Sequence, residues 1–530
     1  MKKDKPIYTL DSETDPFVHG RKPLPFAWGL FTGTYFDFTW GDNCTEEMLA
    51  KLYELPPGII YMHNGGRFDI YFMIEKILNK PMKIINGRIT KALIDCRNGQ
   101  HEIRDSYAIM PQALGSVDSE EGKLDIDYKL MERETRDEYK DEILTYLKRD
   151  VMFLWRLCVE FVDMFGVQLT IGGTAMKELR KIHKFEKLTL SEDQRIRPFY
   201  FYGGRVECFE SGIIEGDFTL YDLNSAYPHA MKTSLHPVGK CYFVDNKISK
   251  DTFFITARGT NRGAFPMRTK QGLTFSEPYG VFHVTIHEWK MAKKLKLFDC
   301  DEIIACHNFT EKETFAEFID KYYNLRMGAE ENKDKIKKLF YKLVMNSAYG
   351  KFAQSSDNYC EYRLTDQTKD MRGEGWELHS LVGSSKRACE NWIIWQRASL
   401  DESMYNVATG CSITGAVRAT LMQAIHSAKR PIYCDTDSLI CESMKASTGK
   451  QLGQWKVEAK CDKIAMAGKK LYALFENGKV VKQANKGVKI SADEIVEVCK
   501  GNEIECFRDA PSFKLDGSYT FIDRTVRMTV

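Results

Sequence analysis

Residues 430–441, with the sequence RPIYCDTDSLIC, place two aspartates between two apolar runs. Apolar runs on both sides of a short polar segment predict a β-hairpin with Asp435 and Asp437 at its turn. An ordinary polar turn explains the tetrapeptide DTDS by itself, but it does not explain acids inserted between strands as apolar as these. The hairpin is therefore a candidate site for chemistry.

A second acid occupies a similar position earlier in the chain. In FTLYDLNSAYP, residues 218–228, Asp222 follows a short apolar strand and precedes a helix. An acid at the end of a strand can hold a metal ion, and the backbone that follows can help to bind a triphosphate. If this strand lies beside the hairpin, Asp222 and Asp437 form the carboxylate pair of a two-metal nucleotidyl-transfer site.

A helix is expected near residues 330–349, and one of its faces carries an unusual set of side chains. At about 100° per residue, four side chains share a stripe about 80° wide. These residues are Lys338, Lys342, Asn346 and Tyr349. A basic stripe is usually a solvated face, but here the small residue Gly350 would also let a base pair approach closely. The stripe therefore predicts a nucleotide-binding helix.

Further acids lie near the N-terminus. Strand periodicity places Asp11 and Glu13 on one face of the segment IYTLDSE. Asp69 follows in HNGGRFD, and Tyr146 and Asp150 lie one helical turn apart. Each piece alone is usually a solvated edge, a turn or a pair of helix neighbours. Together the four carboxylates supply enough oxygen ligands for two Mg²⁺ or Mn²⁺ ions, a pair that can drive phosphodiester hydrolysis.

In their order along the chain, these segments resemble the motifs of family B DNA polymerases. The N-terminal acids resemble the three exonuclease motifs, and residues 222–228, 342–350 and 433–437 resemble polymerase motifs A, B and C. Residues 470–472 and 202–204 resemble the K-x-Y and Y-x-G-G elements. One departure is that Asn64 and Asp69 bracket one residue more than the usual N-x-x-F-D.

The resemblance implies a role for each matching polymerase residue. Asp222 and Asp437 would bind the metal ions, with Asp435 assisting. Lys342 and Lys338 would contact the triphosphate, and Lys342 would protonate the pyrophosphate leaving group. The remaining nucleotide-binding residues would be Tyr227, which excludes a ribose 2′-hydroxyl, and Leu223, Asn346 and Tyr349.

The resemblance also implies the exonuclease and DNA-binding residues. The exonuclease residues would be Asp11, Glu13, Asp69 and Asp150 as metal ligands, together with Tyr146 and Lys123. The DNA-binding residues would be Asn64, Phe68, Tyr202, Gly203, Gly204, Tyr433, Lys470 and Tyr472.

The implied fold is multidomain, α/β followed by α+β. An RNase H-like 3′–5′ exonuclease domain would occupy residues 1–185, with its boundary in the polar, basic stretch near 180–198. A right-hand polymerase would occupy residues 186–530. Its parts would be the palm (186–260 and 401–460), insertion one (261–310), the fingers (311–356), insertion two (357–400) and the thumb (461–530). Sequence patterns further predict helices over 67–78 and 137–165 and one long helix over 311–349.

One branch of the family fits best. Asp11 lies almost at the start, Lys123 precedes the sequence DIDY, and KLVMNSAYGKFA follows the branch pattern. These features resemble protein-primed polymerases of small linear phage genomes and linear plasmids. The resemblance implies two Mg²⁺ or Mn²⁺ ions per active site, and primer-template DNA, dNTPs and a terminal (priming) protein as partners of a monomer. Insertion one would contact the priming protein, and insertion two would encircle DNA, although its aromatic residues suit a small private core equally well.

Composition sets outer limits on the function. Lys+Arg 76 against Asp+Glu 74 leaves a net charge of only +2, so a DNA groove would require local segregation of charge. The 15 cysteines include no C-x-x-C, which argues against a zinc site or a disulfide framework and for a reducing compartment. The sequence has no apolar run of about 18 residues. We therefore expect a soluble protein without membrane contact, in the cytoplasm of the host cell if a phage encodes it.

Three alternatives are open at this point. A primer-independent family B polymerase is the nearest one. A non-catalytic DNA-binding derivative would be expected to have lost carboxylates, yet all seven acids are present. A nuclease with a vestigial synthesis domain is disfavoured by the intact lysine–tyrosine stripe.

Overall fold

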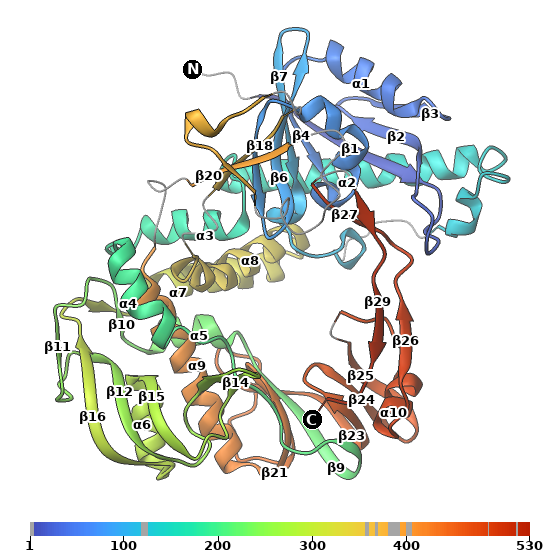
Figure 1. Ribbon diagram of the computed structural model, residues 1–530. Helices are drawn as coiled ribbons and strands as arrows, with labels where there is room; N and C mark the ends of the chain where they lie inside the picture. The colour runs from blue at the N-terminus through green and yellow to red at the C-terminus, as the bar shows by residue number, and fades with distance from the viewer. Residues whose placement is uncertain are drawn as a thin grey trace.

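The computed structural model describes residues 5–117, 126–355, 360–365, 369–379, 393–398, 405–485, 487–515 and 518–529. Within these ranges the chain is a mixed α/β structure built around two large sheets (Figure 1). No described helix combines the length and the apolar character that crossing a membrane requires. Lys123, an expected exonuclease residue, lies outside the described residues.

The N-terminal sheet has ten strands in the order β19-β20-β18-β5-β6-β7-β4-β1-β2-β3. Helix α2 packs across β1, where Thr9 Oγ1 donates to the carbonyl of Val151 at 2.7 Å and Trp155 Nε1 donates to that of Ile7 at 3.0 Å. The helix therefore covers the strand that carries Asp11. The elements are β1 (Ile7–Thr14), β2 (Pro25–Phe31), β3 (Phe36–Trp40), α1 (Cys44–Glu54), β4 (Ile59–Met62), β5 (Pro81–Ile85), β6 (Arg88–Cys96), β7 (Gly99–Asp105), α2 (Lys140–Phe165), β18 (Cys360–Thr365), β19 (Glu377–Leu378) and β20 (Ile393–Ala398).

The prediction of a helix over 67–78 is wrong in its type. The chain forms two short 3₁₀ helices there, η1 (Gly65–Arg67) and η2 (Asp69–Ile77), and η2 is kinked at Met73. Isoleucine and aromatic side chains fill this segment, and their low helix propensity leaves its form to tertiary contacts. The helix expected over 137–165 is confirmed as α2.

The second sheet has seven strands in the order β25-β24-β23-β9-β22-β21-β8. Helix α9 lies against it and is buried along nearly its whole length, as its apolar composition on all sides requires. Strand β23 crosses the palm–thumb boundary expected at residue 460. The elements are β8 (Val206–Cys208), β9 (Gly212–Leu223), α5 (Ala226–Thr233), α9 (Val407–Ser427), β21 (Lys429–Asp435), β22 (Ser438–Ser443), β23 (Trp455–Gly468), β24 (Leu471–Glu476) and β25 (Lys479–Asn485).

The single helix expected over 311–349 is two helices, α7 (Ala316–Glu331) and α8 (Lys335–Phe352). Between them Lys333 adopts a left-handed conformation with φ 57°. The side chain of Asp334 accepts a hydrogen bond from the N–H of Lys337 at 3.0 Å and so caps α8. The polar sequence between the helices therefore supplies a turn and a cap, and α7 folds back against α8.

A separate four-stranded sheet, β11-β16-β12-β15, contains the expected insertion one. It begins earlier than residue 261, because β11 and β12 precede that position. Helices α3 and α4 precede β8 in the chain, and α4 overlaps the stretch near 180–198 expected as a boundary. The elements are α3 (Ile171–Arg180), α4 (Leu190–Tyr200), β10 (His236–Pro237), β11 (Phe243–Asp245), β12 (Thr252–Asn261), β13 (Met267–Thr269), β14 (Gly272–Thr274), β15 (Tyr279–Thr285), α6 (Ile286–Leu295), β16 (Phe298–Asn308) and β17 (Lys312–Glu313).

The expected insertion two does not stand apart from the N-terminal domain. Its strand β18 pairs with β5, so that β18, β20 and β19 extend the N-terminal sheet. Trp376 and Trp395 pack with Met371 in a small buried cluster, and Trp395 Nε1 donates to Thr365 Oγ1 at 2.8 Å. Both tryptophans are therefore core residues in this structure.

The C-terminal segment returns to the N-terminal domain, as the red strands in Figure 1 show. Its hairpin carries Phe513, whose ring stacks on that of Tyr71 at 5.3 Å and 17°. Leu515 joins the core of the N-terminal sheet. The elements of this segment are α10 (Ala492–Cys499), β26 (Ile504–Phe507), β27 (Ser512–Phe513), β28 (Tyr519–Thr520) and β29 (Asp523–Val526).

The buried His236, on β10, and the partly buried His287, on α6, both contact Ser412 of α9. His236 Nδ1 and His287 Nε2 each lie 3.0 Å from Ser412 Oγ, and His236 Nε2 donates to the carbonyl of Ala230 at 2.9 Å. Burial lowers the pKa of His236 to about 3 and that of His287 to about 4. Both side chains are therefore neutral in the folded protein at neutral pH.

This histidine pair predicts a loss of stability in mild acid. The pKa of a histidine in the unfolded chain is about 6.5, so below that pH the unfolded chain binds protons that these two side chains in the folded protein do not bind. Stability is complete above that pH and falls below it, by up to about 1.4 kcal/mol per pH unit for each histidine. We expect His287→Gln to flatten the fall in melting temperature between pH 6.5 and 5. The exposed His426 on α9 supplies the control His426→Gln, and equal slopes for both variants would contradict the prediction.

Candidate active site

Asp222 and Asp437 lie side by side because β9 pairs with β22. Ser438 is the register partner of Asp222, and the N–H of Leu223 donates to the carbonyl of Asp437 at 2.8 Å. The predicted hairpin is confirmed, with β21 ending at Asp435 and β22 beginning at Ser438. The strand ends thus bring together two acids that are 215 positions apart (437 − 222).

The two carboxylates repel each other. Burial, and after it the neighbouring charges of Asp222 and Asp435, together raise the pKa of Asp437 to about 6. Burial also raises the pKa of Asp222, against the opposing charge of Lys456. Carboxylate oxygens at this spacing match the donors that Mg²⁺ or Mn²⁺ prefers. Across the described ranges, no three His, Cys, Asp or Glu side chains form a ready-made metal cluster, so the fit rests on the pair.

Asp435 has a different environment. The ammonium of Lys470 lies 2.5 Å and 2.8 Å from its two carboxylate oxygens, and the hydroxyl of Tyr433 donates to it at 3.2 Å. The backbone N–H of Lys470 donates to the same hydroxyl at 3.0 Å, and the ring of Tyr472 lies 5.2 Å from that of Tyr433. Lys470 and Tyr472 are therefore joined directly to the acidic hairpin, and Asp435 is balanced by its own cation.

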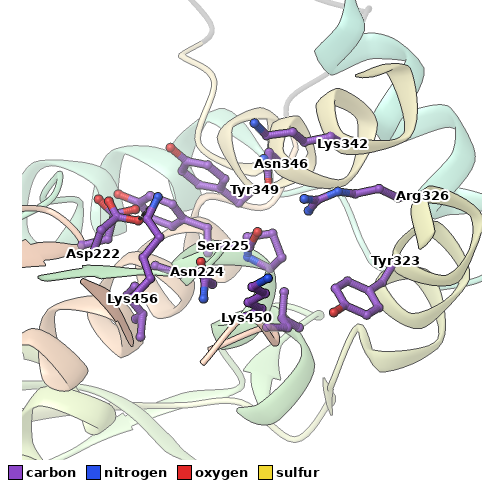
Figure 2. A pocket seen from close by; sticks show the side chains of 16 residues that line it. Asp222, Asn224, Ser225, Tyr323, Arg326, Lys342, Asn346, Tyr349, Lys450 and Lys456 are labelled. Atoms are coloured by element: carbon purple, nitrogen blue, oxygen red, sulfur yellow. Dashed lines mark ion pairs between the residues drawn. The ribbon is translucent and has the colours of Figure 1, made fainter. Parts of the chain in front are cut away.

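A cavity of about 430 Å³ opens beside Asp222 and Asp437 (Figure 2). Three members of the predicted stripe on α8, Lys342, Asn346 and Tyr349, line it. The fourth, Lys338, does not line it, because its ammonium pairs with Glu330 at 2.8 Å. The volume falls within the range of small-molecule sites, and the three stripe residues and the two acids line one cavity.

Two tyrosines form an aromatic wall of this cavity. The rings of Tyr227, from α5, and Tyr349, from α8, stack 3.7 Å apart at 3°. Burial raises the pKa of both phenols, so both remain protonated at neutral pH. Leu223 is buried beneath them at the end of β9.

The cavity also contains cations that sequence reasoning missed. Arg326 from α7, Lys450 and Lys456 line it with Lys342. Burial lowers the pKa of Lys342, and the charges of Arg326 and Lys456 lower it further. Such a set of cations fits a polyanion. The sequence alone does not place Arg326, Lys450 or Lys456 at the cavity. Lys456 could be placed only once β23 is known to pair with β9, because it is then the register partner of Asp222.

Two polar atoms at this cavity have their hydrogen-bonding capacity unused. Arg326 Nε and Asn346 Oδ1 are buried and find no hydrogen-bond partner within the described part of the chain. Unused buried donors and acceptors are rare in proteins. Both residues line the cavity, although these two atoms are themselves shielded from solvent.

The loop Tyr202–Gly204 supports the hairpin from behind. The N–H of Thr436 donates to the carbonyl of Arg205 at 2.7 Å. Arg418, fully buried, donates to the carbonyls of Tyr202 and Gly203 at 2.7 and 2.8 Å. The ring of Tyr202 is itself buried, beneath Arg268. In this structure the loop is therefore a support of the turn, and the Tyr202 side chain expected to contact DNA is part of that support.

A second acidic site lies in the N-terminal domain. Burial raises the pKa of the Tyr146 phenol, and the carboxylates of Asp150 and Glu13 raise it further, so both acids lie near this side chain. Burial raises the pKa of Asp69 to about 6, while the hydroxyl of Ser12 donates to its carboxylate. Because Ser12 lies between Asp11 and Glu13, Asp69 is tied to the strand that carries them.

The extra residue between Asn64 and Asp69 is accommodated by a tight loop. Asn64 is left-handed, with φ 62°. The buried carboxylate of Asp105 accepts hydrogen bonds from the N–H groups of Asn64 at 3.0 Å and Gly66 at 3.1 Å. Arg88 binds this carboxylate at 2.5 Å and the side chain of Asn64 at 2.9 Å. The loop shape is thus fixed, Asn64 is exposed, and Phe68 packs against Phe513.

Comparison with known proteins agrees with this geometry. Residues 117–448 match the family described as DNA polymerase type B, organellar and viral. The DNA-directed DNA polymerase of Enterobacteria phage PRD1 is 42% identical over 558 residues, covering 99% of this chain and 98% of that protein. The DNA polymerase of Bacillus phage phi29 is 25% identical, covering 82% of this chain and 79% of that protein.

A solved structure has the same fold. It is phi29 DNA polymerase in complex with primer-template DNA and incoming nucleotide substrates. The TM-score is 0.73 at 19% sequence identity, and the match covers 99% of this chain and 100% of that chain. At this identity the likeness concerns the fold alone.

The close approach of Gly204 to Thr436 gives a test of the support loop. A Cβ added to Gly204 would lie 2.7 Å from Thr436 Cγ2 and 2.8 Å from its Cβ, whereas one added to Gly203 would meet nothing within 4 Å. We expect Gly204→Ala to speed amide hydrogen exchange across residues 433–440 by at least about tenfold. Mass spectrometry of the exchanging peptides measures this, with Gly203→Ala as the matched control. Identical exchange in the two variants would show that the contact does not hold the turn.

Proposed function

The chain belongs to the type B DNA polymerases of organelles and viruses and is a DNA-directed DNA polymerase, and we propose that it also proofreads, uses divalent cations and starts from a protein primer. The expected fold class, an RNase H-like exonuclease domain followed by a right-hand polymerase, agrees with the phi29 polymerase fold. We further propose that it binds primer-template DNA and dNTPs, as the phi29 complex does.

One observation carries the proposed mechanism of synthesis. Asp222 and Asp437, on paired strand ends, face a cavity whose other walls carry cations and stacked aromatic rings. These two carboxylates would hold the divalent cations, which when bound assist the attacking hydroxyl and the leaving oxygen. Lys342 lies across the cavity, where its ammonium would bind the triphosphate and donate a proton to pyrophosphate.

The walls of the cavity support selection of the nucleotide. The stacked rings of Tyr227 and Tyr349 leave a flat face on which the sugar and base of a dNTP would rest. The phenol of Tyr227 would then lie against the sugar and leave no room for a 2′-hydroxyl. Asn346 would complete its hydrogen bonds with the new base pair.

Proofreading is proposed for the N-terminal acidic site. The carboxylates of Glu13 and Asp150 lie near Tyr146, and Asp69 is tied to the strand of Glu13 through Ser12. With Asp11, they are oxygen donors of the kind that bind Mg²⁺ or Mn²⁺. Asn64 and Phe68, in the loop held by Asp105, would bind the frayed 3′ end.

Separate sites predict separate losses of activity. We expect Asp437→Ala to reduce dNTP incorporation by at least about a hundredfold while it leaves 3′–5′ degradation of single strands intact. The double variant Asp11→Ala, Glu13→Ala should do the reverse. Primer extension and single-strand degradation, assayed on the same preparations, measure both activities. Loss of both activities in one folded variant would refute the two-site assignment.

Protein priming is proposed from the resemblance to the protein-primed branch. It predicts that the polymerase links the first nucleotide covalently to a protein hydroxyl. Labelled dATP, origin DNA and the product of the neighbouring gene should together yield a labelled protein adduct that survives denaturation. Synthesis on bare single-stranded template, with neither primer nor priming protein, would instead establish a primer-independent enzyme.

A further inference from the structure

Lys456 sits where a cation is expected to bind. It lies on β23 opposite Asp222, and its ammonium is 3.3 Å from Asp222 Oδ1 and 3.7 Å from Glu458 Oε1. Figure 2 shows its side chain rising beside Asp222 at the edge of the cavity. The position follows from strand pairing, so the ammonium belongs to the built site.

Lys456 and Lys470 serve different acids of the same cluster. Lys470 pairs with Asp435 at 2.5 Å, while the ammonium of Lys456 lies 3.3 Å from Asp222 Oδ1. With the two carboxylates of Asp222 and Asp437 close enough to repel, an ammonium at Asp222 stabilises the nucleotide-free arrangement. A divalent cation that binds Asp222 must then compete with a cation already present.

The ammonium of Lys456 could also move from Asp222 toward the cavity. Lys456 and Lys342 both line the cavity. Its side chain is 44% exposed, and a lysine stem is long and flexible. Repulsion among the cations of the cavity falls when a polyphosphate enters, because each ammonium then gains an anionic partner.

We propose that Lys456 is a resident counterion of Asp222 that a divalent cation displaces and the incoming triphosphate accepts, so that cation and nucleotide bind as a coupled pair. The inference rests on the proposed cation use at Asp222 and Asp437. Lys456 is a positioning residue in this scheme, because it acts on the metal ligand and on the triphosphate without taking part in bond making. By linkage, the coupling is reciprocal: nucleotide strengthens cation binding as much as cation strengthens nucleotide binding.

Direct Mn²⁺ binding tests the proposal without relying on turnover. Free Mn²⁺ is measured by electron paramagnetic resonance in titrations of the full-length, nucleotide-free protein carrying Asp11→Ala and Glu13→Ala, so that the polymerase site is reported. We expect Lys456→Gln to tighten Mn²⁺ binding about three- to tenfold, because the competing charge is gone. The same change should raise the KM for dNTP by a similar factor, with a smaller effect on kcat.

Two matched variants give the controls. Lys482 lies on β25, and its ammonium is 3.3 Å from the same Glu458 oxygen. Its side chain is 40% exposed. Lys482→Gln should leave Mn²⁺ affinity and the KM for dNTP near those of the parent, and Lys456→Arg should keep both because it keeps the charge. Equal effects of Lys456→Gln and Lys482→Gln, or unchanged Mn²⁺ affinity in Lys456→Gln, would overturn the proposal.

A further variant separates this inference from its premise. Asp437→Ala in the same background should weaken Mn²⁺ binding if the pair holds the cation. If Asp437→Ala leaves Mn²⁺ binding unchanged, the proposed cation site fails, and the role of Lys456 falls with it. If Asp437→Ala weakens binding and Lys456→Gln does not tighten it, only the counterion role is wrong.

Discussion

The pairing of β9 with β22 brings the carboxylates of Asp222 and Asp437 together. The neighbouring parts of the polymerase half offset the repulsion between these two charges. Ser438 opposite Asp222 fixes the register, and the backbone bond from Leu223 to Asp437 leaves the acids no freedom to separate. Burial and mutual repulsion raise the pKa of Asp437 to about 6. Such a pair persists only where surrounding cations or a bound ion offset the repulsion. In this structure Lys456 at Asp222 and Lys470 at Asp435 supply such cations.

Rigid supports hold the acidic hairpin from behind. Arg418 and Glu288 form a fully buried ion pair at 2.7 Å, and Arg418 also binds the carbonyls of Tyr202 and Gly203. The next residues of that loop contact Thr436, between the two aspartates of the turn. A buried ion pair adds little net stability but is costly to break on one side. Its value here is positional, because it connects α6, α9 and the loop behind the turn.

Segments from later in the chain complete the N-terminal domain. Strands β18 to β20 extend the N-terminal sheet although they come from the middle of the sequence. The C-terminal hairpin places Phe513 against Tyr71 and Phe68, and Phe68 immediately precedes Asp69. These contacts join the middle and the C-terminal end of the chain to the N-terminal domain that carries the second acidic site (Figure 1).

The sequence by itself determined the local chemistry: the DTD hairpin, the strand-end Asp222, three of the four residues in the stripe on α8, and α2 with Tyr146 and Asp150. Each of these follows from short-range periodicity, which depends on a few neighbouring residues. Tertiary structure alone decided the 3₁₀ form of η2 and the pairing of β18 with β5. It also decided the positions of Arg326 and Lys456 in the cavity. Those features depend on pairing between strands and on packing across hundreds of residues, and a one-residue change of register would have turned Lys456 away from Asp222.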